Sequence, residues 1–143
     1  KELYDNATPS GNSTMVYNLQ RLGILLDRPE WKNRAVQMLL ALKEPVERYP
    51  LSFERWATAI LQEVYGYQEI AVIGNNATEK ALTLQHRFLP GMVLAASEKP
   101  DEKQPLLAGK TGAQDALIYV CRNYTCQKPV QTLEAFFQMT TPN

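Results

Sequence analysis

The sequence predicts an α+β fold: about three antiparallel helices, then a small, mostly parallel three-stranded sheet containing a βαβ unit, then a C-terminal helix. In residues 1–66, apolar side chains recur every three or four positions, as on one face of an amphipathic helix. From Tyr67 onward the pattern changes to short apolar runs rich in β-branched residues, separated by turn-forming residues. We therefore expect two parts, residues 1–66 and residues 67–143.

Three helices are expected in the first part, and the residues at their ends indicate where each begins and stops. The first helix runs from about Ser13 to the segment DRPEW, where Pro29 suits the first turn of the second helix. Pro45 lies inside the second apolar stripe and predicts a kink or an end there. The third helix is expected to have Ser52 as its N-cap and Gly66 as its stop signal. Short links between helices make them antiparallel neighbours.

The second part is predicted to alternate strands and helices. A strand, a helix and a second strand within about 30 residues form a βαβ unit, so these two strands should be parallel. Asn76 and Glu79 have the spacing of a capping box at the start of the helix between them. Thr132 is expected to cap the last helix, and a proline-broken loop follows the second strand. The expected ranges are strands at 69–75, 91–97 and 116–122, helices at 77–88 and 132–139, and a loop at 98–105.

Composition argues against several classes of function. Lys plus Arg and Asp plus Glu each total 15, so the formal net charge is zero and the positive footprint of a nucleic-acid-binding protein is absent. No apolar run approaches the roughly 20 residues of a membrane-spanning helix. No signal peptide is recognisable at the start, which favours the cytoplasm over secretion, although the chain opens on Lys1 rather than on methionine.

The inventory of metal-binding and nucleophilic residues is small. Cys121, Cys126 and His86 are the three Cys and His residues of the chain, fewer than the four ligands of a closed zinc site. His86 has no nucleophile elbow near it, so it does not point to a Ser-His-Asp triad, and we expect it on the surface. We therefore expect no metal and no cofactor.

The segment YDNATPSGNS, residues 4–13, holds more small polar side chains than a helix start needs. Ser10 is a natural N-cap, and capping takes one or two such side chains. One interpretation is that the segment only starts the helix. The other is that Asp5, Ser10, Asn12 and Ser13 line a cavity and bind a ligand rich in hydroxyl groups, with Asp5 the candidate catalytic group.

Cys121 and Cys126 lie in the segment VCRNYTCQKPV, residues 120–130. A turn over residues 122–125 could bring the two cysteines within reach of a disulfide. Three alternatives stay open from the residues: two packed or loosely paired structural thiols, a local disulfide, and a functional redox pair. The spacing C-x-x-x-x-C differs from the C-x-x-C of redox enzymes.

These two segments resemble those of a known family. DNATPSGNS, residues 5–13, is similar to the D-x-x-x-P-S-G-N-S segment of the thioredoxin-domain-containing, spermatogenesis-associated proteins and their bacterial YyaL-type relatives. YVCRNYTCQKPV, residues 119–130, resembles the family segment Y-V-C-x-N-x-x-C-x-x-P-V. Between them, EIAVIGN and RFLPGMVL match in order and spacing, so the resemblance covers essentially all 143 residues.

The resemblance implies an architecture larger than this chain. Full-length relatives are similar in having an N-terminal thioredoxin-like domain followed by an α/α toroid, akin to N-acylglucosamine epimerases and several glycoside hydrolases. This chain would be the C-terminal part, with residues 1–66 as the end of the toroid and the segment from Asp5 to Ser13 facing its central cavity. The other domains of the same protein would then be its partners.

Three functional hypotheses follow. In the first, the chain contributes one wall of a carbohydrate-binding cavity and is inactive alone. Glycoside hydrolysis takes two carboxylates, and with Asp5 as the one candidate here the second would come from elsewhere in the protein. In the second, the chain is a non-catalytic structural or interaction module. In the third, Cys121 and Cys126 exchange disulfides with the thioredoxin-like domain. The family resemblance brings no reaction with it.

Overall fold

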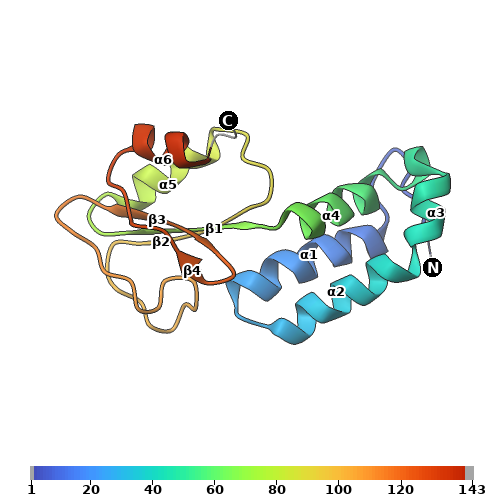
Figure 1. The fold of residues 1–143 in the computed structure, drawn as a ribbon, viewed down its shortest axis with the longest axis horizontal. Helices are drawn as coiled ribbons and strands as arrows, with labels where there is room; N and C mark the ends of the chain where they lie inside the picture. The colour runs from blue at the N-terminus through green and yellow to red at the C-terminus, as the bar shows by residue number, and fades with distance from the viewer. Residues whose placement is uncertain (1, 141–143) are drawn as a thin grey trace. The chain divides into compact units, whose positions relative to one another are not determined.

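The computed structural model describes residues 2–140 and shows an α+β chain. Within these residues it contains six α-helices and a four-stranded mixed sheet. The chain divides into two compact units, residues 1–66 and residues 67–143. Figure 1 shows the helices of the first unit and the sheet with its helices in the second.

The first unit is helical. Its elements are α1 (Gly11–Leu25), α2 (Pro29–Ala41), α3 (Lys43–Arg48), the 3-10 helix η1 (Pro50–Ser52) and α4 (Glu54–Tyr65). Both α2 and α4 pack against α1, as Figure 1 shows. The core lies among these helices, and its buried residues are Val16, Ala35, Leu39, Val46, Phe53, Trp56 and Ala59.

Two helix boundaries differ in detail from the sequence-based expectation. The second predicted helix ends at Ala41, and the chain restarts as α3, with Pro45 in its first turn. A proline is tolerated there because the first backbone N–H groups of a helix have no intrahelical acceptor. The prediction that Ser52 caps the third predicted helix is wrong: Ser52 ends η1, and Phe53 holds the N-cap position of α4. A phenyl ring cannot accept a hydrogen bond from the helix start.

The second unit is built on the mixed sheet. Its elements are β1 (Gln68–Ile73), α5 (Ala77–Gln85), β2 (Met92–Ser97), β3 (Leu117–Arg122), β4 (Thr125–Cys126) and α6 (Leu133–Thr140), and the strand order is β2-β1-β3-β4. β1 and β2 are parallel, which confirms the βαβ unit. The expectation of a mostly parallel three-stranded sheet is wrong, because β3 runs antiparallel to β1 and β4 antiparallel to β3. The link from β2 to β3 holds turns in place of a crossover helix, so β3 can return in the opposite direction.

The two faces of the sheet are covered by different parts of the chain. Ile70 and Val72 of β1 face a core that includes Phe136 of α6 and the buried side of α5. Ala71 and Ile73, one residue out of step, pack with Leu107 from the link between β2 and β3. Figure 1 shows α5 and α6 together on one face and this link on the other. β1 is therefore covered on both faces, which explains its unbroken apolar run.

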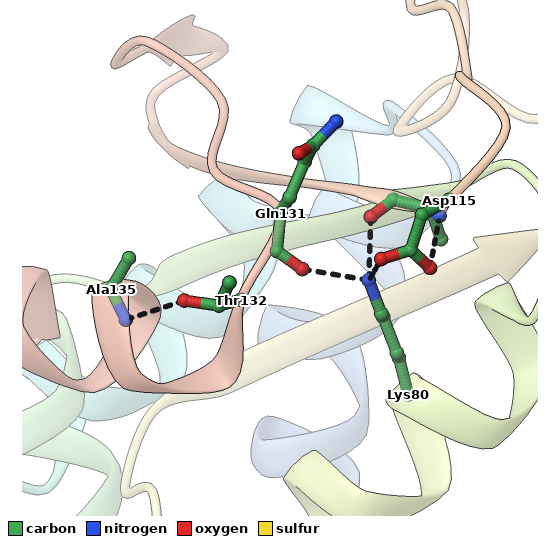
Figure 2. A network of polar contacts seen from close by, with 6 residues as sticks. Lys80, Asp115, Gln131, Thr132 and Ala135 are labelled. Atoms are coloured by element: carbon green, nitrogen blue, oxygen red, sulfur yellow. Dashed lines mark hydrogen bonds and ion pairs between the residues drawn. The ribbon is translucent and has the colours of Figure 1, made fainter.

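Polar contacts hold α5 to the segment that precedes β3 and to the segment that precedes α6. The Nζ atom of Lys80 donates to Asp115 Oδ2 at 2.8 Å, to the Ala116 carbonyl at 3.0 Å and to the Gln131 carbonyl at 2.7 Å (Figure 2). In the same view Thr132 Oγ1 accepts from the Ala135 N–H at 3.2 Å, which confirms Thr132 as the cap of α6.

The predicted capping box at the start of α5 is wrong. Asn76 has a φ of 64°, in the left-handed region, and its side chain makes no cap hydrogen bond within residues 2–140. The preceding Gly74 has a φ of 122°, and a Cβ on Gly112 would lie 2.6 Å from its Cα. The turn after β1 is thus set by two glycine backbones in close approach rather than by capping.

None of the helices within residues 2–140 is long and apolar enough to cross a membrane.

Candidate functional site

Asp5 sits at the meeting point of two helix starts. Its Oδ1 atom accepts from the Ser10 N–H at 2.8 Å and from the Ser13 hydroxyl at 2.6 Å, and its Oδ2 atom accepts from the Arg55 N–H at 2.9 Å. Ser10 caps α1, with its Oγ atom accepting from the Ser13 N–H at 3.1 Å. Asp5 therefore supplies to α4, from about 50 residues away, the capping acceptor that Phe53 cannot.

Three of the four predicted ligand-binding side chains converge here, but they face one another. Asp5, Ser10 and Ser13 are 7%, 3% and 0% exposed. Asn12 points elsewhere, donating from Nδ2 to the Glu2 carbonyl at 2.7 Å. We call Asp5, Ser10 and Ser13, with the Arg55 N–H, the Asp5 clamp. Its contacts account for both oxygens of the carboxylate, which is the arrangement of a structural joint.

The electrostatics of Asp5 agree with this geometry. Burial by itself would raise the pKa of the Asp5 carboxyl. Hydrogen bonds from the Ser13 hydroxyl and from the Ser10 and Arg55 N–H groups outweigh that effect and hold the pKa below its usual value. Asp5 is therefore a charged acceptor near neutral pH and a poor general acid.

A small surface pocket of about 240 Å³ opens beside the Asp5 clamp. It is lined by Asp5 and the loop after it, and by Glu54, Arg55 and Thr58 of α4. Glu54 and Thr58 are exposed and Arg55 is half-buried. Sequence reasoning missed these three residues because nothing local links them to the loop. The one signal available was the missing capping side chain before Glu54, which implies an acceptor from a distant segment.

Arg55 is stacked on an aromatic ring at the edge of this pocket. Its guanidinium carbon lies 3.7 Å from the centroid of the Tyr17 ring, and that of Arg21 lies 4.8 Å from the same centroid. The Arg55 Nε atom is buried and has no hydrogen-bond partner among residues 2–140. The stacking fixes the guanidinium against the Tyr17 ring and so holds the positive charge of a pocket-lining residue in place.

A larger, apolar groove of about 440 Å³ lies on the helical unit. Three of its large aliphatic side chains are well exposed: Leu40 at 67%, Leu61 at 54% and Val64 at 73%. Lys43, Glu47 and Glu63 supply the charges along it. The remaining lining residues are Val36, Leu39, Val46, Ala57 and Ile60, so the groove runs over α2, α3 and α4.

The two cysteines form a disulfide across the β3–β4 hairpin. Cys121 and Cys126 are opposite residues of the two strands, and the turn between the strands places Asn123 and Tyr124 at φ values of 49° and 58°. Cys121 is buried and Cys126 is exposed. Of the three alternatives that the sequence leaves open, the structure contains the local disulfide.

A buried carboxylate, which the sequence analysis did not single out, lies beside this hairpin. Glu69 of β1 is 2% exposed, is paired in register with Cys121, and accepts from the Tyr124 N–H at 2.9 Å. Burial lowers the pKa of Lys110, and the charge of Glu69 opposes that shift. A polar pocket of about 360 Å³ adjoins the hairpin, with Arg122, Thr125, Gln68 and Gln127 among its walls.

Within residues 2–140, no group of three or more His, Cys, Asp or Glu side chains is placed to hold a metal ion. His86 follows the end of α5 and is exposed.

Comparison with known proteins finds relatives that are much longer than this chain. Spermatogenesis-associated protein 20 of human and of rat are each 26% identical to it over 140 residues, and the mouse protein is 24% identical over the same length. Each alignment covers 91% of this chain but 18% of the relative. No protein-family model matches the chain, and no solved structure matches it significantly. The chain is thus homologous to one part of spermatogenesis-associated protein 20, and it spans about a fifth of that protein's length.

Proposed function

We propose that this chain is the C-terminal part of a longer protein, in which its helical unit is a packing module and is inactive alone. The observation that carries the proposal is the apolar groove of α2, α3 and α4, taken with the short span of the chain relative to its homologues. In this proposal residues 1–66 are the last helices of the α/α toroid that the family resemblance implies. The occupant of the groove is a helix of the polypeptide that precedes Lys1 in the full-length protein.

The chemistry of the groove fits such an occupant. Leu40, Leu61 and Val64 present aliphatic surface to water. Fully burying a side chain of this kind stabilises a protein by about 1.5–3 kcal/mol. The charges of Lys43, Glu47 and Glu63 lie beside this surface, as expected where the apolar stripe of an amphipathic helix is flanked by polar positions.

The substitution Leu61→Asp tests the packing module in two contexts. In the full-length protein it should lower the free energy of unfolding by about 2–3 kcal/mol, because a carboxylate would be buried against the packed helix. In the 143-residue chain it should leave stability nearly unchanged, because Leu61 is 54% exposed. Urea unfolding followed by tryptophan fluorescence measures both.

Leu51→Asp is the matched control, because Leu51 is 84% exposed and lies outside the groove. It should be neutral in both contexts. If Leu61→Asp changed the free energy of unfolding equally little in the full-length protein and in the 143-residue chain, the groove would not be a contact with the rest of the protein. Self-association of the 143-residue chain that Leu61→Asp abolishes would assign the groove to a second copy instead.

A second candidate function rests on the pocket beside the Asp5 clamp. The residues that line its roughly 240 Å³ include Asn6, Glu54, Arg55 and Thr58, whose side chains carry an amide, a carboxylate, a guanidinium and a hydroxyl. Such a mixture of donors and acceptors suits the hydroxyl groups of a sugar. The pocket also offers a second carboxylate, Glu54, beside Asp5 within this chain. We therefore retain the carbohydrate cavity as a second proposal. In it Glu54 contacts the ligand, and Ser10 and Ser13 hold Asp5 in place by hydrogen bonds.

Glu54→Gln tests this second function in the full-length protein. Binding of glucose, N-acetylglucosamine and maltose is measured by calorimetric titration. The variant should bind the preferred sugar at least tenfold more weakly than the unmodified protein, because it loses a charge-assisted hydrogen bond to a sugar hydroxyl. Asn12→Ala is the control, since Asn12 bonds the Glu2 carbonyl and does not line the pocket. Binding that Glu54→Gln leaves unchanged would exclude the pocket, as would the absence of sugar binding by the unmodified protein.

A further inference from the structure

The turn between β3 and β4 is held in a backbone conformation that its residues do not favour. Two consecutive positive φ angles, at Asn123 and Tyr124, are those of a type I′ turn. That turn prefers Asn followed by Gly, and the left-handed conformation of a tyrosine brings its Cβ atom too close to the following carbonyl oxygen. The conformation persists because its surroundings hold it.

Two contacts hold the turn in this conformation. The Cys121–Cys126 disulfide joins the residues that flank the turn on each strand. The buried Glu69 carboxylate accepts the Tyr124 N–H at 2.9 Å and so fixes the second turn residue onto β1. Beyond these, β4 is only two residues long, so few ladder hydrogen bonds secure the tip of the hairpin.

Access to the disulfide is one-sided. Cys121 is 3% exposed and lies opposite Glu69 within the sheet. Cys126 is exposed on β4, an edge strand of the sheet. An incoming thiolate therefore meets the sulfur of Cys126 first.

We propose that the Cys121–Cys126 disulfide is a reversible redox latch, opened in the folded chain by a dithiol and releasing the turn at Asn123 and Tyr124. One thiolate of the dithiol attacks Cys126 Sγ, the S–S bond breaks, and Cys121 Sγ leaves as a thiolate that takes up a proton. The second thiolate of the dithiol attacks the dithiol's own sulfur in the mixed disulfide and releases Cys126 as a thiolate, which takes up the second proton that the dithiol gave up. The dithiol ends as a cyclic disulfide and the protein as two thiols, so electrons and protons balance.

Opening the latch has a structural consequence beyond the hairpin. Arg122 and Thr125 are the two ends of the turn and also walls of the polar pocket of about 360 Å³. When the turn relaxes, these walls move, so the redox state of the cysteines sets the shape of the pocket.

The test is the rate at which dithiothreitol reduces the native chain, followed by alkylation of the new thiols and mass spectrometry. The expected rate is proportional to dithiothreitol concentration and changes less than twofold across urea concentrations below the unfolding transition. The backbone amide signal of Tyr124 should shift on reduction, while those of Val72 and Ile118 in the core strands stay in place. The double variant Cys121→Ala/Cys126→Ala should show the reduced-state spectrum at all dithiothreitol concentrations.

Three results would overturn the latch. Reduction that accelerates with urea in step with global unfolding would make the disulfide a plain structural staple. If the backbone amide signal of Tyr124 did not shift on reduction, the conformation of the turn would not depend on the disulfide. Loss of the Val72 and Ile118 signals on reduction would show that the disulfide holds the whole unit rather than the hairpin.

Discussion

Asp5→Ala is expected to lower the free energy of unfolding of the helical unit by about 3 kcal/mol. The substitution removes the acceptor of three hydrogen bonds and leaves the Ser10 and Arg55 N–H groups and the Ser13 hydroxyl without it. Ser10 and Ser13 are almost fully buried, so water cannot replace the lost acceptor without opening the structure. Urea unfolding measures the loss through Trp56, which is 1% exposed in the same unit.

The control for this prediction is Asn12→Ala in the same segment. Asn12 makes an exposed hydrogen bond to the Glu2 carbonyl, and its loss should change the unfolding free energy by less than about 1 kcal/mol. If Asp5→Ala were as stable as the unmodified chain, the Asp5 clamp would not be the joint between α1 and α4. Asp5 would then return as a candidate for ligand binding.

The effect of Asp5 should also depend on pH. Its pKa is lower in the folded chain than its usual value, about 3.9 in an unfolded chain. A carboxylate of this kind contributes stability that is fully present above the unfolded pKa and is lost as the pH falls through the folded pKa. The difference in unfolding free energy between the unmodified chain and Asp5→Asn should therefore be largest near pH 7 and shrink below about pH 4. A difference that stayed constant between pH 7 and pH 3 would contradict the role of the charge.

Periodicity predicted those parts of the fold that depend on local sequence. The apolar stripes of α2 and α4 arise because each helix buries one face, and the β-branched run of β1 arises because both faces of that strand are buried. The direction of β3 could not be predicted in the same way. It depends on how the long link after β2 covers the sheet through Leu107, which is a long-range contact without a periodic signal.

The candidate site shows the same limit. Ser10 was recognisable as a cap because its partner, the Ser13 N–H, lies three residues away. The role of Asp5 was not, because one of its partners is Arg55, 50 residues further along the chain. The surplus of polar residues in the segment is thus explained largely by a clamp between two helix starts. Glu69 was hidden for a related reason: within an apolar run, a single acidic residue gives no sign that a distant turn will donate to it.

Lys80→Met is expected to lower the unfolding free energy of the unit formed by residues 67–143 by about 2 kcal/mol. The side chain of Lys80 is 16% exposed and its Nζ atom donates to two backbone carbonyls, those of Ala116 and Gln131, in addition to the Asp115 carboxylate. Methionine keeps most of the aliphatic stem but offers no donor, so the carbonyls lose their partner (Figure 2). Hydrogen exchange of the Ile118 and Val120 amides in β3 measures the change.

Asp115→Asn separates the ion pair from the carbonyl contacts. The side chain of Asp115 is 55% exposed, and exposed ion pairs contribute little to stability. The hydrogen bond from Lys80, at 2.8 Å, lowers the pKa of Asp115 from its usual value. We expect Asp115→Asn to change the exchange of Ile118 and Val120 much less than Lys80→Met does. Equal effects of the two substitutions would mean that the ion pair, and not the two carbonyl contacts, ties α5 to the chain before β3 and α6.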